Sequence, residues 1–454
     1  MQAKINKKLI IILVAVVAGI AVIGLSIGLI FSNRVPKGYV KEFGGNMFWE
    51  KEDKPSESDN VVVPDMSIRI YNYAPSIFQE DENTRYAYYC SNRYTIGKME
   101  GENFMDEKGN NQVTDYIAFR KGVKVKGEWY WSEKSYLISP ITLNGKPNHA
   151  YEGTQICDPN VIKGEFKYRG TTYPYLMAYL ACSTRDNQFN HICLAVAEKP
   201  EGPWVRCADI NPLVEYTTDG VPENMLDTYL WGYGQASMIS VDKKGRVLMF
   251  YSAIKPFDVG NGNWAHRTVT SIARYDFSDL NNVKTEFFVP HMSVAGILRM
   301  DSLSRGEKPT QVSTVTNSDF AYDPTTNSIY GITDGNYNDI FGYGAAPVFR
   351  INNMSKNQTA EIGDVFKFFN GNISAGGLCW ETIAQVRSNN ATYNPAVHNT
   401  CLIRDAYGWL LSSEKLEVAL STGQVASRLS SVYPGEKNNL WSYRIIRQEV
   451  EIPQ

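Results

Sequence analysis

The chain of 454 residues lacks the excess of positive charge that nucleic-acid-binding proteins usually carry. Its net charge at pH 7 is −3, and no basic stripe is interleaved with aromatic residues. It also lacks a phosphate-binding P-loop, a dinucleotide-binding G-x-G-x-x-G, the G-x-S-x-G element of serine hydrolases and any C-x-x-C pair. These absences argue against nucleic-acid partners, phosphoryl transfer, dinucleotide chemistry, serine hydrolysis and a four-cysteine zinc site.

Histidine and cysteine are scarce. The chain has five histidines, none of them in an i, i+4 pair, so we predict no zinc site and no resident cofactor. Seven cysteines is an odd number, so at least one is unpaired. Cys182 with Cys193, and Cys379 with Cys401, are possible pairs, but spacing does not determine connectivity. Buried free thiols are the default interpretation.

One long hydrophobic run is present, over residues 9–31, and it contains no charged residue. A helix of this length crosses a hydrocarbon core of about 30 Å. The lysines of residues 1–8 should keep that flank in the cytoplasm. We therefore predict a signal anchor that crosses the cell membrane once, rather than a cleaved signal peptide, whose apolar region usually has about 7–15 residues. Residues 32–65 should form a flexible spacer on the extracytoplasmic side.

Residues 66–454 contain short runs rich in Val, Ile, Tyr and Phe, bounded by Gly, Pro and Asn, as strands are. The clearest unit opens at Asp158-Pro159-Asn160-Val161 and closes at Glu201-Gly202-Pro203-Trp204. Similar units open near residues 74, 235, 319 and 399, at a spacing of about 80 residues.

Radial repetition of four-stranded sheets buries many short strands without long open edges. We therefore predict an all-β fold, a five-bladed β-propeller, preceded by one N-terminal transmembrane helix. A pair of β-sandwiches does not explain the nearly regular spacing. In a propeller the first strand of each blade lines the axis, so the residue that opens each blade should point into a central pocket.

The opening Asp158-Pro159-Asn160-Val161, the aromatic hairpin after it and the closing Glu201-Gly202-Pro203-Trp204 resemble a blade of the family 43 glycoside hydrolases, the arabinanases and β-xylosidases. The resemblance covers about residues 70–275 and is weaker in the last two blades. It implies a carbohydrate partner and inverting hydrolysis by three carboxylates: a base Asp, a second Asp that sets the acid's pKa, and an acid Glu. A structural Ca²⁺ on the axis is compatible with this likeness, although the sequence has no motif for it.

The chain departs from that pattern at two of three positions. It has Ala74 where the family has the base, Asp158 at the second Asp, and Gln235 where the family has the acid. Ala accepts no proton and Gln donates none at neutral pH. Hydrolysis would therefore need other groups.

Several residues near the blade openings are candidates for these roles. Glu223 and Asp227 precede blade three, and His398 lies next to the opening of blade five, where a histidine could serve as acid or base near neutral pH. The candidate catalytic residues are thus Asp158, His398, Glu223 and Asp227. Polar pocket residues and aromatic rings able to stack on sugars are the candidate substrate-binding residues: Gln235, Asn399, Asp319, Trp231, Tyr73 and Trp380.

Three functions are compatible with these features. The first is a membrane-anchored, extracytoplasmic glycosidase with a replaced acid and base. The second is a catalytically inactive propeller that binds glycans. The third is a protein-interaction propeller at the cell surface. Whether the chain is an enzyme depends on which side chains meet at the axis.

Overall fold

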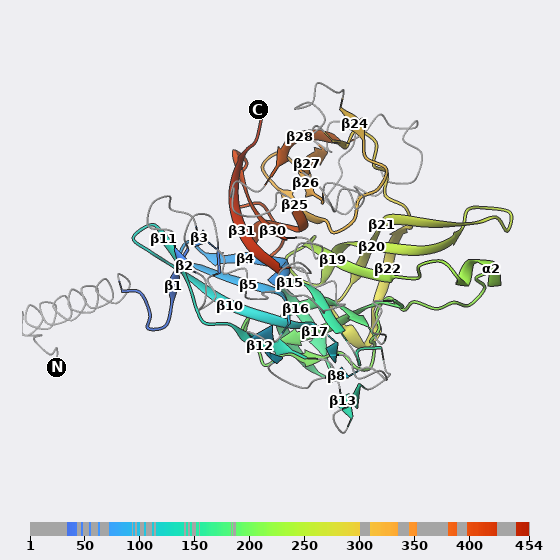
Figure 1. Cartoon of the computed structure of the whole chain (residues 1–454), viewed down its shortest axis with the longest axis horizontal. Helices are drawn as coiled ribbons and strands as arrows, with labels where there is room; N and C mark the ends of the chain where they lie inside the picture. The colour runs from blue at the N-terminus through green and yellow to red at the C-terminus, as the bar shows by residue number, and fades with distance from the viewer. Residues whose placement is uncertain are drawn as a thin grey trace, which may run out of the picture.

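The structure is a computed structural model of the chain (Figure 1). It describes residues 34–42, 47–48, 54–55, 62–63, 72–92, 94–95, 98–99, 104–105, 111–112, 115–139, 142–143, 146–147, 151–153, 155–182, 184, 188–299, 309–334, 345–351, 380–387, 397–424 and 442–453. Residues 1–8 and 9–31 lie outside this set, so the cytoplasmic flank and the membrane anchor remain predictions. Among the described residues, no helix is both long and apolar enough to cross a membrane.

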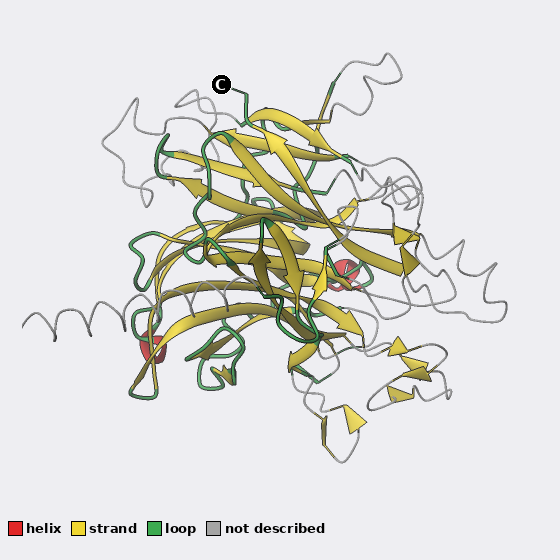
Figure 2. Cartoon of the chain, turned by 90° about the vertical axis from the view of Figure 1, so that its left-hand side faces the viewer, coloured by secondary structure: helices red, strands yellow, loops and turns green. Residues whose placement is uncertain are grey.

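Strands dominate the described part of the chain. Figure 2 shows that helix is confined there to two short segments, α2 (Glu223–Leu226) and η1 (Leu280–Asn282). The strand sequences are rich in β-branched and aromatic residues, which pack well on a pleated, half-buried surface. The prediction of an all-β body is confirmed.

The long strands form three four-stranded antiparallel sheets and one nine-stranded sheet, which is antiparallel except at a single parallel pairing. Division of the nine-stranded sheet at that pairing gives five antiparallel units, which we call blades one to five in chain order. Blade one has β4 (Asn72–Asp81), β5 (Thr84–Asn92) and β10 (Asp115–Val125), with β11 (Glu128–Trp131), β12 (Ser135–Ile138) and β1 (Val40–Lys41) outside them. Blade two has β15 (Gln155–Tyr168), β16 (Thr171–Cys182), β17 (His191–Ala197) and β18 (Val205–Arg206). Blade three has β19 (Gly232–Ser240), β20 (Arg246–Asp258), β21 (Trp264–Asp276) and β22 (Lys284–Val289). Blade four has β25 (Asp319–Asp323), β26 (Ser328–Ile332), β27 (Ala346–Ile351) and β28 (Glu381–Val386), and blade five has β29 (Val397–Asp405), β30 (Lys415–Gln424) and β31 (Ser442–Glu451).

Short two-stranded ribbons complete the described strands. They pair β2 (Lys54–Pro55) with β3 (Val62–Val63), β6 (Tyr94–Thr95) with β7 (Lys98–Met99), β8 (Phe104–Met105) with β9 (Asn111–Gln112), β13 (Thr142–Leu143) with β14 (Lys146–Pro147), and β23 (Leu298–Arg299) with β24 (Thr310–Gln311).

The innermost strands of the five blades close into a ring. The strands β4, β15, β19, β25 and β29 contact each other in that order, and β29 also contacts β4. This last contact is a parallel pairing in which Arg404 lies opposite Phe78 and Asp405 opposite Gln79. Five sheets around one axis is the arrangement of a β-propeller, as the sequence predicted. Blade five differs from the expected four strands, because its described part has three.

The hydrophobic core is divided among the interfaces between neighbouring blades. Between blades two and three, for example, Ile162, Leu176 and Leu194 pack with Met238 and Met249. Comparable clusters fill the interfaces of blades one and two, three and four, and four and five. Because each blade covers the faces of its neighbours, the apolar faces of the described sheets are buried in these clusters.

The interface between blades five and one contains residues from the N-terminal segment. Met47 and Phe48 are each 1% exposed, and Phe48 packs edge-on against the ring of Trp131. Met47 N also donates a hydrogen bond of 3.0 Å to Ile445 O in β31. Burial of one such side chain stabilises the fold by about 1.5–3 kcal/mol. The prediction of a flexible spacer over 32–65 is therefore wrong for these residues and for β1, which pairs with β11.

Candidate functional site

Five residues, one at the inner start of each blade, share an unusual backbone conformation. The φ angle is 49° at Ala74, 46° at Asp158, 52° at Gln235, 50° at Asn317 and 45° at Asn399. None is glycine, and the left-handed region costs other residues about 1–2 kcal/mol each. In blades one, two, three and five the strand register also shifts here. Strain repeated at equivalent positions of all blades indicates a functional site.

These five residues line one cavity on the propeller axis. Its volume is about 30 Å³, which is space for water molecules but not for a sugar ring. The predicted pocket residues Asp158, Gln235 and Asn399 are thus brought together as expected. A ligand larger than water would bind at the mouth of this cavity.

Asp158 is the carboxylic acid that the sequence predicted at this pocket. Its side chain comes from β15 and is 7% exposed. Burial, together with the negative charges of Asp115 and Asp334, raises the pKa of Asp158 to about 8. The group is therefore protonated at neutral pH and is able to donate a proton.

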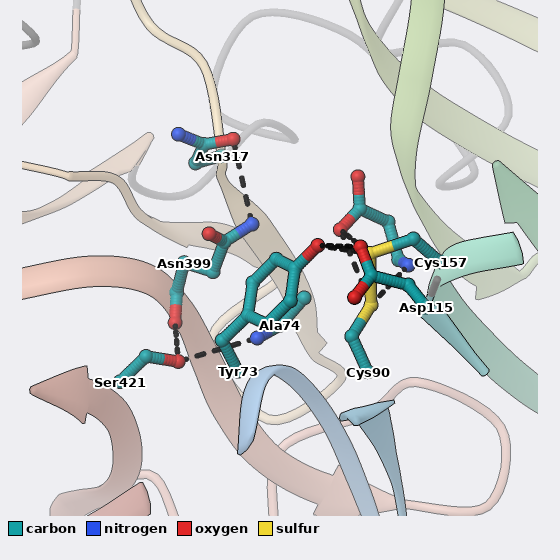
Figure 3. Close-up of a disulfide and its surroundings, with 9 residues drawn as sticks. Tyr73, Ala74, Cys90, Asp115, Cys157, Asn317, Asn399 and Ser421 are labelled. Carbon is teal, nitrogen blue, oxygen red and sulfur yellow. Dashed lines mark hydrogen bonds between the residues drawn. A yellow bond between two sulfur atoms is a disulfide. The ribbon is translucent and has the colours of Figure 1, made fainter. Parts of the chain in front are cut away.

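A disulfide between Cys90 of β5 and Cys157 of β15 joins blades one and two beside Asp158 (Figure 3). The Cα atoms of the two cysteines are 5.1 Å apart. Sγ of Cys157 lies 3.1 Å from Oδ1 of Asp158, and the backbone N of Asp158 lies 2.8 Å from Sγ of Cys90. The two sulfurs and the carboxylate are close enough to hold a metal ion, but sulfurs joined in a disulfide are not thiolate ligands.

The sequence did not identify this pairing. Cys182 and Cys193 are both buried free thiols, so the pair considered there is not formed. Cys401 is a buried free thiol as well, and Cys379 lies outside the described residues.

Tyr73 connects the two sides of the pocket. Its Oη donates a hydrogen bond of 2.8 Å to Oδ2 of Asp115 and lies 2.8 Å from Sγ of Cys157. Figure 3 shows this hydroxyl pointing at the disulfide and Asp115. Burial raises the pKa of Asp115 to about 6, although the hydrogen bond from Tyr73 lowers it. The ring of Tyr73 stacks on the imidazole of His398, with centroids 6.1 Å apart.

His398 is held by a second acid, Asp334, which follows β26. His398 Nδ1 lies 3.2 Å from Asp334 Oδ2, and Asn317 Nδ2 donates to the same oxygen at 2.5 Å. Asn399 Nδ2 in turn donates to Asn317 Oδ1 at 3.4 Å. Burial raises the pKa of Asp334, whereas the contacts with His398 and Asn317 lower it. An imidazole oriented by a carboxyl group is the usual arrangement of a general base.

Three oxygens of this cluster make no hydrogen bond, although each is buried. They are Oδ1 of Asp115, Oδ1 of Asp334 and Oδ1 of Asn399. Buried polar atoms without partners are rare and need an explanation such as bound water or a role in the site. Hydroxyl groups of a ligand, or water, would supply the missing donors.

The start of blade four is Asn317, not Asp319 as predicted, because the left-handed residue is Asn317. Asp319 lies two residues further along and borders the bottom of the cavity. Its Oδ1 accepts a hydrogen bond of 2.6 Å from Ser237 Oγ, and its Oδ2 accepts one of 2.9 Å from Leu402 N. Its Oδ1 also lies 3.3 Å from Nη1 of Arg404.

The guanidinium of Arg404 thus supplies a positive charge beside Asp319, behind the lining of the cavity. Its Nη2 donates to Asn160 Oδ1 at 3.0 Å, and its Nη1 donates to the carbonyl of Phe320. The side chains of Arg404 and Asp319 are 3% and 6% exposed. These residues do not fit the structural Ca²⁺ that the family likeness allowed at this position, because a cation already pairs with the carboxylate.

Gln235 and Trp231 also belong to the pocket region. Gln235 Oε1 accepts a hydrogen bond of 2.9 Å from Asn317 N, which links blades three and four. Trp231 is 6% exposed and packs in an apolar cluster with Ala74, Leu180 and the disulfide. Trp231 therefore supports the wall of the pocket, and its side chain offers little surface for stacking.

Three predicted residues lie elsewhere. Glu223 and Asp227 are exposed, in and just after α2, which lies at the periphery in Figure 1, and neither borders the cavity. Trp380 is 2% exposed, its Nε1 donates to Ser293 O at 2.8 Å, and its ring packs on Phe349 in the core. The indole of Trp380 is therefore not accessible to a sugar.

Asp115, Asp334 and Asn317 were missed by the sequence interpretation. Asp115 opens β10 and Asp334 closely follows β26, so both are acids at strand ends on the pocket side of their blades. An acid at a strand end, level with a blade opening, is the signal that would have identified them.

No protein-family model and no curated protein sequence matches the chain. Among solved structures, a family 117 glycoside hydrolase of Zobellia galactanivorans has 10% identity and a TM-score of 0.46, with 91% of this chain and 90% of that chain covered. An α-L-arabinofuranosidase of Podospora anserina has 10% identity and a TM-score of 0.44, with 92% of this chain and 98% of that chain covered. A thermostable family-43 glycoside hydrolase has 12% identity and a TM-score of 0.40, with 85% of this chain and 90% of that chain covered. Likenesses at this level do not assign an activity, so the function has to be inferred from the pocket itself.

Proposed function

We propose that the chain is a membrane-anchored, extracytoplasmic glycoside hydrolase that acts on polysaccharide or oligosaccharide, with an acid and a base that differ from those of family 43. The observation that carries the proposal is the pair of titratable groups on either side of Tyr73. On one side Asp158 is protonated at neutral pH, because its pKa is raised to about 8. On the other side His398 is oriented by Asp334.

These two groups have the complementary properties that hydrolysis of a glycosidic bond requires. Asp158 donates its proton to the oxygen of the leaving sugar as the bond to the anomeric carbon breaks. His398 takes a proton from a water molecule, which attacks the same carbon from the other side, and Asp334 stabilises the resulting imidazolium. The axial cavity has room for water, and Oδ1 of Asn399, which lines it, makes no hydrogen bond and can accept one from a hydroxyl group.

The extracytoplasmic location is part of the proposal. The uncharged run of residues 9–31 supports an anchor. The Cys90–Cys157 disulfide also supports it, because disulfides persist in oxidising compartments and are rare in the cytosol.

The test is sugar release by the full chain in detergent on arabinan, xylan and nitrophenyl glycosides. We expect Asp158→Asn and His398→Asn each to reduce the rate about 10²–10⁴-fold, the usual contribution of a general acid or base. The control is Asp209→Asn, at an exposed carboxylate that pairs with Arg169 far from the pocket, which should keep the wild-type rate. Full activity of Asp158→Asn would refute the assignment of the acid. Glycan binding without any sugar release would instead indicate an inactive glycan-binding propeller.

A further inference from the structure

The β20–β21 hairpin extends beyond the pocket end of blade three. Gly232, the first residue of β19, pairs with Ile254, so the hairpin from Lys255 onward has no β19 partner. Lys255 lies opposite position 231, which is four residues before Gln235. Lys255 is therefore about 13 Å beyond the pocket along the strand direction. In Figure 1 the hairpin and α2 project from one side of the propeller, whereas β1 and β11 lie on the opposite side. The hairpin therefore forms a wall beside the mouth of the cavity.

A half-buried lysine on this wall has aromatic neighbours but no acidic partner. Lys255 Nζ lies 4.9 Å from the ring centroid of Tyr233, 5.0 Å from Phe257 and 6.0 Å from Tyr216. It forms no ion pair within the described part of the chain. Burial lowers the pKa of Lys255, as expected for a cation removed from water without a counter-charge. Asp258 is the nearest acid in sequence, but it points to the other face of the strand and accepts a hydrogen bond from Gly260 N.

Further positive charge lies directly beside Lys255. Arg267 of β21 is its cross-strand partner, so the two side chains project from the same face. Like charges in this position destabilise a sheet. His291 is close as well: its ring lies 4.8 Å from that of Phe257, and burial and the charge of Arg267 lower its pKa. Among the residues that the structure describes, no carboxylate forms an ion pair with any of these three basic groups, so an anion that binds between them stabilises them.

We propose that Lys255 and Arg267 form a subsite for an anionic group carried by the saccharide, a carboxylate of a uronic acid or a sulfate ester. The proposal rests on the proposed function and narrows its substrate class to acidic polysaccharide. The cations bind the anionic group, and the partly exposed rings of Tyr233 and Phe257 contact the apolar face of the same sugar. Other sugar units of the polymer then reach from the wall to the axial cavity.

The experiment measures binding of the full chain in detergent to four immobilised polymers. These are polygalacturonate, which carries carboxylates, dextran sulfate, which carries sulfates, neutral arabinan, and polyglutamate, which has carboxylates but no sugar. The variants are Lys255→Gln and Arg267→Gln, with unfolding curves to check that each still folds. The control is Lys243→Gln, at the end of blade three opposite the β20–β21 hairpin. In the wild type, Nζ of Lys243 lies 4.0 Å from the ring centroid of Trp409.

We expect tighter binding to one of the acidic polysaccharides than to arabinan, and weakening of about tenfold in each hairpin variant but not in the control. The polymer that shows this effect identifies the anionic group. Equal weakening for polyglutamate would overturn the proposal, because it would indicate nonspecific charge attraction. Binding of arabinan alone would overturn the acidic subsite and leave the proposed function standing, whereas binding of none of the sugar polymers would overturn both.

Discussion

Replacement of Asp158 by Asn should make the stability of the protein less dependent on pH. The folded protein holds the proton on Asp158 up to a pKa of about 8, whereas in the unfolded chain the group has its ordinary value of 3.8. Folding therefore takes up a proton between these values, and the stability of the wild type falls as the pH rises from about 4 to about 8. Asn cannot titrate, so the variant lacks this loss.

The size of the effect follows from the two pKa values. They differ by about four units, and each unit corresponds to about 1.4 kcal/mol, so Asp158 destabilises the fold by about 5–6 kcal/mol above pH 8. Between pH 5 and pH 7 the stability of the wild type should fall by about 2–3 kcal/mol relative to that of Asp158→Asn. Asp115 also has a raised pKa, but it is present in both proteins, so its contribution largely cancels in the difference.

The assay is urea unfolding followed by tryptophan fluorescence at several pH values from 5 to 8. The control is Asp209→Asn, because the hydrogen bond with Arg169 lowers the pKa of that exposed carboxyl. Asp209→Asn removes a carboxyl group with a lowered pKa, so it should decrease the stability slightly, whereas Asp158→Asn should increase the stability at high pH. A difference between Asp158→Asn and the wild type that stays constant from pH 5 to pH 8 would refute the assignment of a protonated Asp158.

Two further predictions concern the groups around the cavity. Replacement of both Cys90 and Cys157 by Ser should lower the unfolding free energy by about 4 kcal/mol, because the disulfide closes a loop of 67 residues. If the urea midpoint of the wild type does not change when the disulfide is reduced, this prediction is wrong. Arg404→Ala should cost about 3–5 kcal/mol by leaving the carboxylate of Asp319 buried and unpaired. The double variant Arg404→Met/Asp319→Asn should recover part of that loss, and a double variant less stable than Arg404→Ala would argue against the ion pair.

The blade openings could be predicted from sequence because each is a local feature. Four of the five predicted positions, at 74, 158, 235 and 399, coincide with left-handed residues at the cavity. Blade four was misplaced by two residues, because Asn317 and Asp319 are both polar residues before an apolar run. A shift of two residues keeps a side chain on the same face of a strand and moves it about 7 Å along the axis. Alternation of apolar and polar residues therefore could not separate the two positions.

The contacts that define the chemistry of the site are not local. The Tyr73–Asp115 hydrogen bond joins residues 42 positions apart, and the disulfide joins residues 67 apart. Cys90 is on the second strand of blade one and Cys157 on the first strand of blade two, so only the docking of the two blades brings them together. Cysteine spacing carries no information about that docking, which is why the sequence suggested other pairs.

On the proposed function, the carboxyl groups near the cavity have different roles. The openings of blades one and three carry Ala74 and Gln235, neither of which exchanges a proton at neutral pH, whereas Asp115 and Asp334 contribute carboxyl groups from blades one and four. Burial and the charges of Asp115 and Asp334 raise the pKa of Asp158, because a group in a low-dielectric site beside like charges ionises less readily. Asp115 and Asp334 therefore help to keep the proton on Asp158, and Asp158 is the group that donates it.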